Sequence, residues 1–295
     1  MRASPYADLN RPPLHESALR RALQVEGGLW TDLRVVAETA STNADVVEAA
    51  RSGADEGLIV VAESQTAGRG RLTRRWQSPP RAGLTFSVLL RPDAAVPAVA
   101  MGWLPLLIGV ALAEAVGRIA MVETALKWPN DLLVNDGSGD GGPEYGKCAG
   151  VLGEMVPAAA GGAGPPGIVV GVGLNVSQTA AELPAPADTA APRPTSLAVA
   201  GAMCTDRDPL LRGILRAIAV WYGRWRDADA DTEASGLRAA YRDYCVTVGR
   251  EVAVSLPEGG VLHGHASDVD AQGRLVVRTP DGERAVAAGD VEHVR

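Results

Sequence analysis

The sequence predicts an α+β fold: a mixed, largely antiparallel sheet packed with helices, followed by a small β-barrel at the C-terminal end. Strand-like runs are grouped in the middle of the chain, helical patterns lie on both sides of them, and the last part consists of short strands separated by turns. Grouped strands indicate an α+β arrangement, because a parallel βαβ sheet needs strands that alternate with helices. We therefore expect two domains, residues 1–247 and residues 248–295.

The first predicted elements are two helices and a strand. Residues 14–26 can form one short helix, and the segment STNADVVEAARSG is typical of a capped helix. Ser41 or Thr42 is expected to supply the N-cap of that helix, and Gly53 to end it. The β-branched run GLIVVAES at residues 57–64 predicts a strand.

An uncharged stretch follows the next predicted strand, GLTFSVLL. Residues 94–113 carry no charge over a length that can span a membrane. The stretch is rich in alanine and glycine, Pro97 and Pro105 interrupt it, and acidic residues bound it at Asp93 and Glu114. These features favour a buried core helix over a transmembrane span.

The middle of the chain predicts strands, and the part that follows predicts helices. Three apolar runs with turn residues between them are expected strands: residues 125–135, 145–156 and 167–176. The Gly-rich insert at 136–146 is typical of a flexible hairpin tip, and 178–195 of a long exposed loop. An Asp-Pro pair at Asp208 predicts a helix over 208–227, and another helix is expected at roughly 233–245.

The C-terminal domain is predicted from four short strand patterns. They are REVAVSL, VLHGHASDVD, RLVVRT and ERAVAAGD, and the turn sequences PEGG, AQG and PDG separate them. A module of this length cannot build a large core of its own, so we expect a compact barrel that docks on the main domain.

Composition and charge argue against several classes of protein. The formal net charge is −7 and the sequence pI is about 5.2, which argues against broad binding to nucleic acid or to a membrane surface. The three cysteines, Cys148, Cys204 and Cys245, form no CxxC pair, so neither a zinc site nor a disulfide framework is indicated. We expect a reducing compartment, because the N-terminal residues also lack the apolar core of a signal peptide. Dinucleotide-binding and P-loop patterns are missing as well.

The segment GRGRLTRRW, residues 68–76, carries four arginines and no acid in an acidic chain. Gly68 and Gly70 let the backbone approach a ligand closely, and the planar forks of Arg69 and Arg71 suit a phosphate or a carboxylate. The tryptophan that ends the segment can close over a flat ring. By itself the segment leaves three interpretations open: an anion-binding loop, a solvated basic loop and a contact to nucleic acid.

Two further motifs bring charge to the ends of strands. In KWPND, residues 127–131, a lysine, an amide and a carboxylate can converge on one point, and Asp131 could hold Mg²⁺; the alternative is a polar turn. In KCAGVLGE, Lys147 lies in a run otherwise fit for a buried strand, so it needs a partner, either an anionic ligand or Glu154. The neighbouring Cys148 is either a nucleophile or, as is more common, a small hydrophobic residue.

Together and in this order, the motifs resemble those of the biotin protein ligases. The matching residues are STN at 41–43, Gln65, GRGRxxRxW at 68–76, KWPND at 127–131, KxAGVLxE at 147–154 and GVGLNV at 171–176. The resemblance covers about residues 35–295 and includes the C-terminal module. It implies a class II synthetase-like or lipoate-ligase-like main fold with a C-terminal SH3-like β-barrel.

The resemblance also implies a role for each matching residue. Biotin would be bound by Ser41, Thr42, Asn43, Gln65, Gly68, Arg69, Gly70, Arg71, Lys147 and Gly150. ATP would be bound by Arg71, Arg74, Trp76, Asn130, Asp131, Lys147 and Asn175. Lys147, Arg71 and Arg69 would act in catalysis, and Asp131 would hold the metal ion.

The activity that the resemblance implies is a two-step ligation with ATP, Mg²⁺ and biotin. Biotin would be activated to biotinoyl-5′-AMP and then transferred to a lysine of the biotin carboxyl carrier protein of an acyl-CoA carboxylase. The arginines, the lysine and Mg²⁺ would neutralise charge in the first step. We expect a cytoplasmic enzyme that does not bind a membrane. We also expect no DNA binding, because only 40 residues precede Ser41, too few for the winged helix-turn-helix of longer family members.

Two rival interpretations remain open. A lipoate ligase or an octanoyltransferase shares the scaffold, and an octanoyltransferase would need Cys148 as its nucleophile. A nucleic-acid-binding module that uses Arg69 to Arg75 would show a steep dependence on salt and no need for ATP.

Overall fold

The structure is a computed structural model that describes residues 10–71, 74–93, 95–137, 144–157, 165–186, 191–257 and 259–294. Its helices are α1 (Glu16–Leu23), α2 (Thr42–Arg51), α3 (Leu104–Ala120), α4 (Arg207–Asp227) and α5 (Leu237–Tyr244), and a 3₁₀ helix, η1 (Ala98–Trp103), leads into α3. The first sheet contains β1 (Asp32–Val36), β2 (Leu58–Ala62), β3 (Gly83–Leu90), β4 (Thr124–Lys127), β5 (Asp131–Asn135), β6 (Tyr145–Val156) and β7 (Gly167–Asn175). The second contains β8 (Glu251–Ser255), β9 (Val261–Val269), β10 (Leu275–Thr279), β11 (Gly282–Val286) and β12 (Asp290–His293).

The first sheet is mixed and largely antiparallel, as predicted. Its strand order is β1-β2-β3-β7-β6-β5-β4, and among its described strands β1 and β2 form the one parallel pair. β1 is not predicted from the sequence. This edge strand has five residues and buries only Leu33 fully, so its hydrophobic pattern is too short to be recognised.

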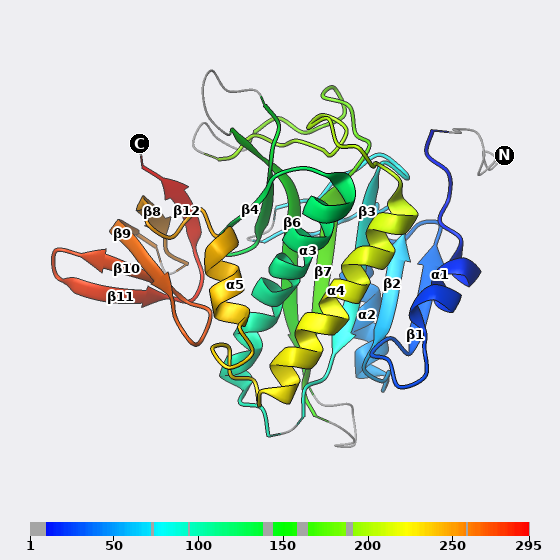
Figure 1. The fold of residues 1–295 in the computed structure, drawn as a ribbon, viewed down its shortest axis with the longest axis horizontal. Coiled ribbons are helices and arrows are strands. Elements are labelled where there is room, and N and C mark those ends of the chain that lie inside the picture. Colours follow the sequence, from blue (N-terminus) through cyan, green and yellow to red (C-terminus); the bar gives the residue numbers. More distant parts are fainter. Residues whose placement is uncertain are drawn as a thin grey trace.

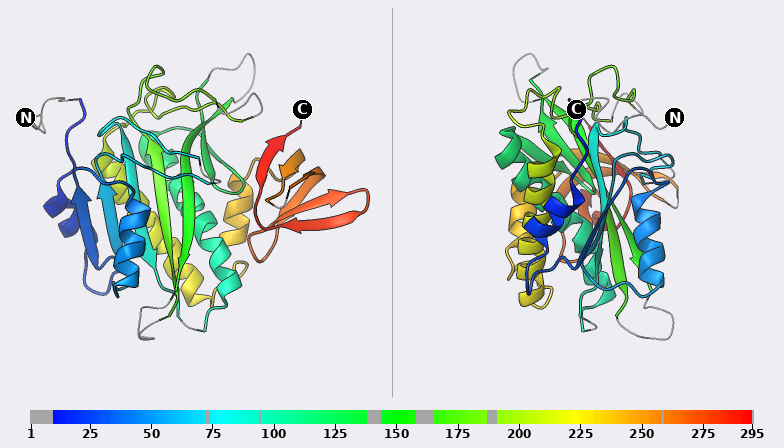
Figure 2. Two further views of the ribbon diagram at one scale, coloured as in Figure 1. Left: turned by 180° about the vertical axis from the view of Figure 1, so that it is seen from behind. Right: turned by 90° about the vertical axis from the view of Figure 1, so that its right-hand side faces the viewer.

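Helices cover both faces of the first sheet (Figure 1, Figure 2). On one face lie α1, α3, α4 and α5, and on the other face α2 packs against β2, β3, β6 and β7. The core under α2 consists of small and branched side chains: Val46, Ala50, Leu58, Val60, Leu89, Val156 and Val169. The larger core on the opposite face contains three fully buried tryptophans, Trp103, Trp128 and Trp225, which supply bulk in a chain with one phenylalanine.

The uncharged stretch is a core helix, as predicted. By length and hydropathy, Ala98–Ala120 is the one helix among the described residues that could cross a membrane, but 72% of its apolar window is buried inside the protein. It packs between α4 and the strands β4 to β7, so its apolar surface is covered by the fold itself. Pro105 lies in the first turn of α3, where a missing N–H costs no helical hydrogen bond.

Two helix starts differ in detail from the prediction. Asp206, rather than Asp208, caps α4, and its carboxylate accepts a hydrogen bond of 3.0 Å from the N–H of Asp208. Pro209 is therefore the third residue of the helix and not the first. Ser41 is the N-cap residue of α2, as expected, but its side chain accepts no capping hydrogen bond from that helix.

The second sheet is antiparallel and contains five strands in the order β11-β10-β9-β8-β12. Four strand patterns are predicted there; the last, ERAVAAGD, divides into β11 and the start of β12, because the chain crosses back to pair with β8. The predicted all-β module is thus confirmed, and its strands form an antiparallel sheet. The division of the chain at residue 248 stays a prediction, and so does the hairpin tip at 136–146, most of which lies outside the described residues.

The second sheet docks at the β4 edge of the first sheet (Figure 1). The indole N–H of Trp128 donates a hydrogen bond of 3.1 Å to the carbonyl of Gly273, and Arg238 of α5 forms an ion pair of 2.6 Å with Asp268 of β9. The side chain of Lys127 donates to the carbonyl of Val291. These contacts bring β12 beside the turn that joins β4 and β5, which contains most of the KWPND motif.

Candidate active site

A cavity of about 590 Å³ opens where the arginine-rich segment, the KWPND turn and β12 meet the glycine-rich strands β6 and β7. It is lined by every predicted site residue except Gly68: Ser41, Thr42, Asn43, Gln65, Arg69, Gly70, Arg71, Arg74, Trp76, Asn130, Asp131, Lys147, Gly150 and Asn175. Gly68 lies instead at a neighbouring hollow of about 370 Å³ on the other side of Trp76. Residues that are far apart in the sequence are therefore brought to one place.

One end of the cavity carries a buried cluster of hydroxyl and amide groups. The backbone N–H and the Oγ1 hydroxyl of Thr42 both donate to Oε1 of Gln65, at 2.8 Å and 3.1 Å. The hydroxyl of Ser87 lies 2.8 Å from Oγ1 of Thr42 and 2.6 Å from Oδ1 of Asn43. Sequence reasoning missed Ser87, although a single serine inside the apolar strand GLTFSVLL is a recognisable anomaly. The cluster fixes the orientations of the predicted biotin-binding side chains.

Glu154 does not line the cavity, but it contacts two residues at this end. Its Oε1 accepts a hydrogen bond of 2.7 Å from Nδ2 of Asn43 and forms an ion pair of 3.1 Å with Arg69. The suggestion that Glu154 is the partner of Lys147 is therefore wrong. Gly171 is required beside the cluster, because a Cβ atom there would lie 1.9 Å from Oδ1 of Asn43.

Trp76 lies flat against the floor of the cavity. A Cβ atom at Gly173 of β7 would approach Cε2 of Trp76 to 2.3 Å, and one at Gly150 of β6 would lie 3.7 Å from Cζ3. The indole Nε1 is buried and finds no hydrogen-bond partner among the described residues. The glycines of GVGLNV and KCAGVLGE thus form a smooth surface for an aromatic ring, a purpose that sequence reasoning did not assign to Gly173.

At the other end of the cavity, Lys147 pairs with Asp131. The distance between Nζ and Oδ1 is 2.6 Å, and the two side chains are 29% and 13% exposed. Register explains the contact: β5 and β6 are neighbours, and an irregularity in their pairing sets Lys147 opposite Leu133, two residues from Asp131. A charged residue in a buried strand is tolerated because its partner is on the adjacent strand.

Lys127, the lysine of KWPND, is a further cation at this end of the cavity, although no biotin or ATP contact was predicted for it. Its residue is 9% exposed, and burial lowers the pKa of its ammonium, an effect that Asp131 opposes and Lys147 reinforces. The chain contains only two lysines, and both line this cavity. The site therefore concentrates all the ammonium side chains of an arginine-rich protein.

The second sheet completes the wall. Nη1 of Arg71 donates to Oδ1 of Asn130 at 3.4 Å and to the carbonyl of Gly289 at 3.2 Å, and burial lowers the pKa of its guanidinium below the ordinary value. Arg74 forms an ion pair with Asp290. Asp290 lies more than 200 residues from Arg74 in sequence, which is why local motifs did not point to it.

The segment expected to be a long exposed loop, 178–195, also borders the cavity. Its lining residues are Pro184, Ala185, Ala191, Pro192 and Pro194. The backbone N–H of Lys147 donates to the carbonyl of Arg193 at 2.8 Å, and the N–H of Thr195 donates to the carbonyl of Lys147 at 2.9 Å. The loop therefore continues the pairing of β6 beyond the end of β7, which corrects the expectation of an exposed loop for this part.

Cys148 lies behind the cavity and does not line it. The side chain is fully buried, its Sγ donates to the carbonyl of Asn175 at 3.3 Å, and burial strongly raises the pKa of its thiol. A buried thiol that stays protonated is a poor nucleophile. Of the two interpretations of Cys148, a small hydrophobic residue fits these observations and a nucleophile does not.

The fold and the site together are typical of ligases that activate an acyl group and attach it to a protein. Residues 35–175 match the Biotin/lipoate A/B protein ligase family, and residues 247–294 match the Biotin protein ligase C terminal domain. The chain is 40% identical over 292 residues to the biotin–[acetyl-CoA-carboxylase] ligase of Mycobacterium tuberculosis, covering 98% of each chain. It belongs to the biotin protein ligase family.

Two further relatives bear on this assignment. The chain is 30% identical over 293 residues to the bifunctional ligase/repressor BirA of Bacillus subtilis and covers 83% of that protein. The structure of a biotin protein ligase from Aquifex aeolicus in complex with biotin and ATP matches with a TM-score of 0.68 at 26% identity, covering 90% of this chain and 100% of that one. The similarity thus extends across both sheets.

Proposed function

We propose that this chain activates biotin with ATP to biotinoyl-5′-AMP and transfers biotin to a specific lysine of the biotin carboxyl carrier domain of an acyl-CoA carboxylase. The observation that carries the proposal is the cavity itself, in which hydroxyl and amide groups lie at one end and paired cations at the other. The 40% identity to a biotin–[acetyl-CoA-carboxylase] ligase supports the choice of acid and of acceptor.

The polar cluster is the biotin end of the site. The ureido ring of biotin offers two N–H donors and one carbonyl acceptor, which hydroxyl and amide side chains can satisfy. Thr42 and Gln65 are suited to this because they hydrogen-bond to each other, and Asn43 because Ser87 and Glu154 hold its amide. The hydroxyl of Ser41 is not used as a helix cap. Gly68, Gly70 and Gly150 would let the ring and the closing loop approach the backbone.

The cationic end is the nucleotide end. The biotin carboxylate attacks the α-phosphorus, forming an O–P bond while the bond to the β-phosphate oxygen breaks and pyrophosphate leaves. Two anions must meet in this step, so Lys147, Arg69 and Arg71 would neutralise their repulsion and stabilise the charge that moves onto the leaving group. Arg74, Trp76, Asn130 and Asn175 would hold the rest of the nucleotide, with the indole beside the adenine.

The residues present fit a magnesium ion that arrives with the nucleotide. Among the described residues, no group of three His, Cys, Asp or Glu side chains is arranged to hold a metal ion by itself. Asp131 offers one carboxylate at the cationic end, and Mg²⁺ commonly binds through one or two carboxylates together with substrate phosphates. The ion would supply further neutralisation of phosphate charge there.

In the second step the neutral amine of the carrier lysine attacks the carbonyl of the mixed anhydride. An amide bond forms, the bond between the acyl carbon and the phosphate oxygen breaks, and AMP leaves. The adenylate must be protected from water until then, which is the purpose we assign to the arginine-rich segment. We place the enzyme in the cytoplasm, because Cys148, Cys204 and Cys245 are all free thiols.

The test is biotin-dependent exchange of labelled pyrophosphate into ATP with Mg²⁺, with lipoate and octanoate in parallel. Exchange with biotin alone is expected. Exchange with lipoate or octanoate in place of biotin would replace the proposal with the rival acid, and the absence of exchange with all three acids would remove the ligase activity. Transfer is then followed by mass spectrometry of a purified carrier domain, which should gain one biotin on one lysine.

A further inference from the structure

One polar cluster extends from the wall of the cavity, at Asn175, to a residue that has no role in the chemistry above, Gln178. Asn175, which ends β7 and lines the cavity, is 5% exposed, and both ends of its amide have protein partners. Its Nδ2 donates to the carbonyl of Thr195 at 2.9 Å, and its Oδ1 accepts from Nε2 of Gln178 at 3.0 Å. Gln178 is 1% exposed and does not line the cavity, so its contact to the ligands can only be indirect.

Gln178 also binds the segment that follows the arginine-rich loop. Its Nε2 donates a second hydrogen bond, of 2.9 Å, to the hydroxyl of Ser78, which is two residues beyond Trp76. Its Oε1 accepts a hydrogen bond of 2.7 Å from the backbone N–H of Val176. Both N–H groups and the carbonyl of this one amide are therefore used, and they join the end of β7 to the base of the loop.

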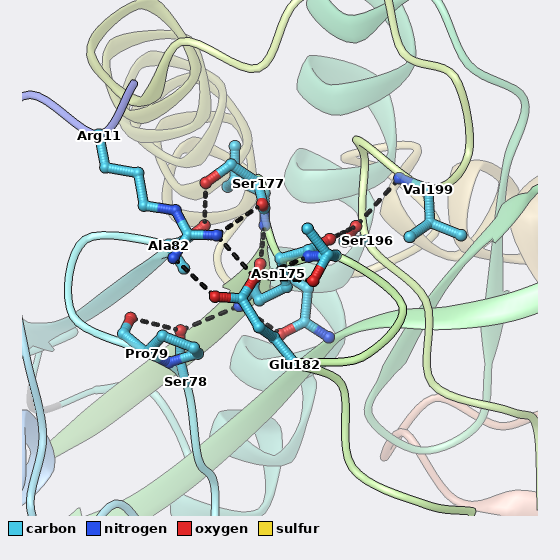
Figure 3. Close-up of polar contacts among 12 residues, drawn as sticks. Arg11, Ser78, Pro79, Ala82, Asn175, Ser177, Glu182, Ser196 and Val199 are labelled. Atoms are coloured by element: carbon cyan, nitrogen blue, oxygen red, sulfur yellow. Dashed lines mark hydrogen bonds and ion pairs between the residues drawn. The ribbon is translucent and has the colours of Figure 1, made fainter. Parts of the chain in front are cut away.

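The backbone that carries Gln178 is held from several sides (Figure 3). The hydroxyl of Ser196 donates to the carbonyl of Gln178 at 2.7 Å, and the N–H of Ser177 donates to the carbonyl of Ala82 at 2.8 Å. Arg11 adds a hydrogen bond of 3.0 Å from Nη2 to the carbonyl of Ser177. A side chain on a turn fixed in this way holds its partners with little further loss of conformational freedom.

Space for the cluster is provided by Gly83, the first residue of β3. A Cβ atom at Gly83 would lie 3.1 Å from Nε2 of Gln178 and 3.1 Å from Oγ of Ser78, and only 2.7 Å from the carbonyl oxygen of Leu174. The hydrogen bond between Gln178 and Ser78 therefore runs directly over a glycine. Because any side chain at position 83 would collide with these atoms, the hydrogen bond between Gln178 and Ser78 depends on this glycine, which indicates a specific contact.

We propose that Gln178 is a positioning residue for the nucleotide end of the site, a role that rests on the proposed function. Oδ1 of Asn175 accepts the hydrogen bond from Gln178, which fixes the orientation of the amide with its nitrogen toward the carbonyl of Thr195. Of the two N–H groups on that nitrogen, Thr195 uses one, which leaves the other for the nucleotide. Through Ser78, the same amide fixes where the segment carrying Trp76 meets the sheet.

The experiment compares three single variants with the wild-type chain. Gln178→Met keeps the length of the side chain and removes all three hydrogen bonds. Ser78→Ala removes the link between Gln178 and the loop, together with a local hydrogen bond of 3.2 Å to the carbonyl of Pro79. Thr179→Ala is the matched control, because Thr179 is exposed on the same turn and its hydroxyl binds Glu182 rather than the cluster. For each protein, the KM for ATP, the KM for biotin and kcat are measured by pyrophosphate exchange, and hydrogen exchange is measured on the peptide 74–80.

We expect Gln178→Met to raise the KM for ATP about tenfold and Ser78→Ala about threefold, the factors that correspond to one net hydrogen bond or part of one. The KM for biotin should change less than about twofold, and peptide 74–80 should exchange faster in both variants but not in Thr179→Ala. A KM for ATP that stays near the wild-type value, or an equal rise in both KM values, would overturn the role. A merely structural residue would produce that equal rise together with a lower melting temperature.

Two outcomes separate this inference from the function beneath it. If the wild-type chain shows no biotin-dependent pyrophosphate exchange, the proposed function fails, and the hydrogen-exchange rates of peptide 74–80 alone test the role of Gln178. Unchanged rates in Gln178→Met would show that Gln178 does not hold this segment, and faster rates would show that it does. If Gln178→Met does not fold, the KM for ATP and the hydrogen exchange of peptide 74–80 in Ser78→Ala test the proposal instead.

Discussion

Lys147 of β6 and Asp131 of β5 form an ion pair, with Nζ and Oδ1 2.6 Å apart, at the cationic end of a cavity built from both sheets. In the proposed reaction, the phosphates of ATP replace the carboxylate as the partner of Lys147, and the freed carboxylate becomes available to Mg²⁺. Binding of ATP would thus place Lys147 beside the phosphates and free Asp131 for the metal ion.

The first prediction concerns Lys147. Lys147→Ala should lower kcat for biotin-dependent pyrophosphate exchange by about 100- to 1,000-fold, the range for removing one group that stabilises developing charge. The melting temperature should fall as well, because the largely buried carboxylate of Asp131 loses its partner. Because the chain has two lysines, amine labelling followed by mass spectrometry can check the assignment: ATP should protect Lys147 from the reagent. Labelling that ATP leaves unchanged would contradict it.

A second prediction concerns the part that the C-terminal sheet takes in the site. Asp290→Ala removes the partner of Arg74 and should change the KM for ATP by about three- to tenfold while the KM for biotin stays within about twofold. Asp281→Ala, on an exposed turn of the same sheet, is the matched control. Equal kinetics for the two variants would show that the contact between Asp290 and the arginine-rich segment has no bearing on the nucleotide.

The floor under Trp76 provides a third, steric prediction. Gly173→Ala would place a Cβ atom 2.3 Å from the indole, so Trp76 must move and the KM for ATP should rise at least about tenfold. In Gly223→Ala the new methyl group on α4 meets nothing within 4 Å. That control should keep its activity and gain up to about 1 kcal/mol of stability from helix propensity. A Gly173→Ala enzyme with normal kinetics would contradict the position assigned to the ring.

Cys148 gives a fourth prediction, which separates the ligase from a cysteine-dependent transferase. Cys148→Ser keeps the hydrogen bond to the carbonyl of Asn175 and should change kcat by less than about twofold, at a cost of about 1 kcal/mol of stability for burying a hydroxyl. Thermal unfolding and pyrophosphate exchange are measured on the same preparation. Loss of activity in a folded Cys148→Ser protein would revive the octanoyltransferase interpretation.

The fifth prediction is a pH dependence of stability at the junction of the two sheets. His293 of β12 binds Oγ1 of Thr247 at 3.2 Å, and burial lowers its pKa to about 4, with smaller contributions from Lys127 and Arg250. Since the unfolded chain binds this proton at pH values near 6.5, the free energy of unfolding should decrease as the pH falls from about 6.5 to 4, and this contribution should level off below that.

Melting temperatures at pH 7.5, 6, 5 and 4 test this dependence. His293→Gln removes the titrating group, so its melting temperature should fall less between pH 7.5 and 5 than that of the wild-type chain. His263→Gln, on an exposed position of β9, should follow the wild-type curve. Parallel curves for the wild-type chain and His293→Gln would assign the acid sensitivity to other groups.

Local patterns were enough for most of the fold and for the chemical character of the site. Runs such as GLIVVAES and GLTFSVLL indicate strands because β-branched and apolar residues follow a glycine in a short stretch. The arginines of GRGRLTRRW predict an anion site only through the family resemblance that KWPND and KCAGVLGE share with them. The same reasoning missed β1, whose five residues bury one side chain fully. For the segment 178–195 it was right only in part: residues 179–186 are mostly exposed, as expected, but 191–195 pack against β6, and proline and alanine look alike in both settings.

By itself, the sequence determined which residue types are available to the site and the order in which they occur, because composition and short-range periodicity are properties of the chain alone. Only the tertiary structure decided the partners. Asp131, and not Glu154, pairs with Lys147 because of the register between β5 and β6, and Asp290 reaches Arg74 because the second sheet docks beside the first. Ion pairs and hydrogen bonds depend on distances of a few ångströms in space, and a sequence specifies those distances only after the chain has folded.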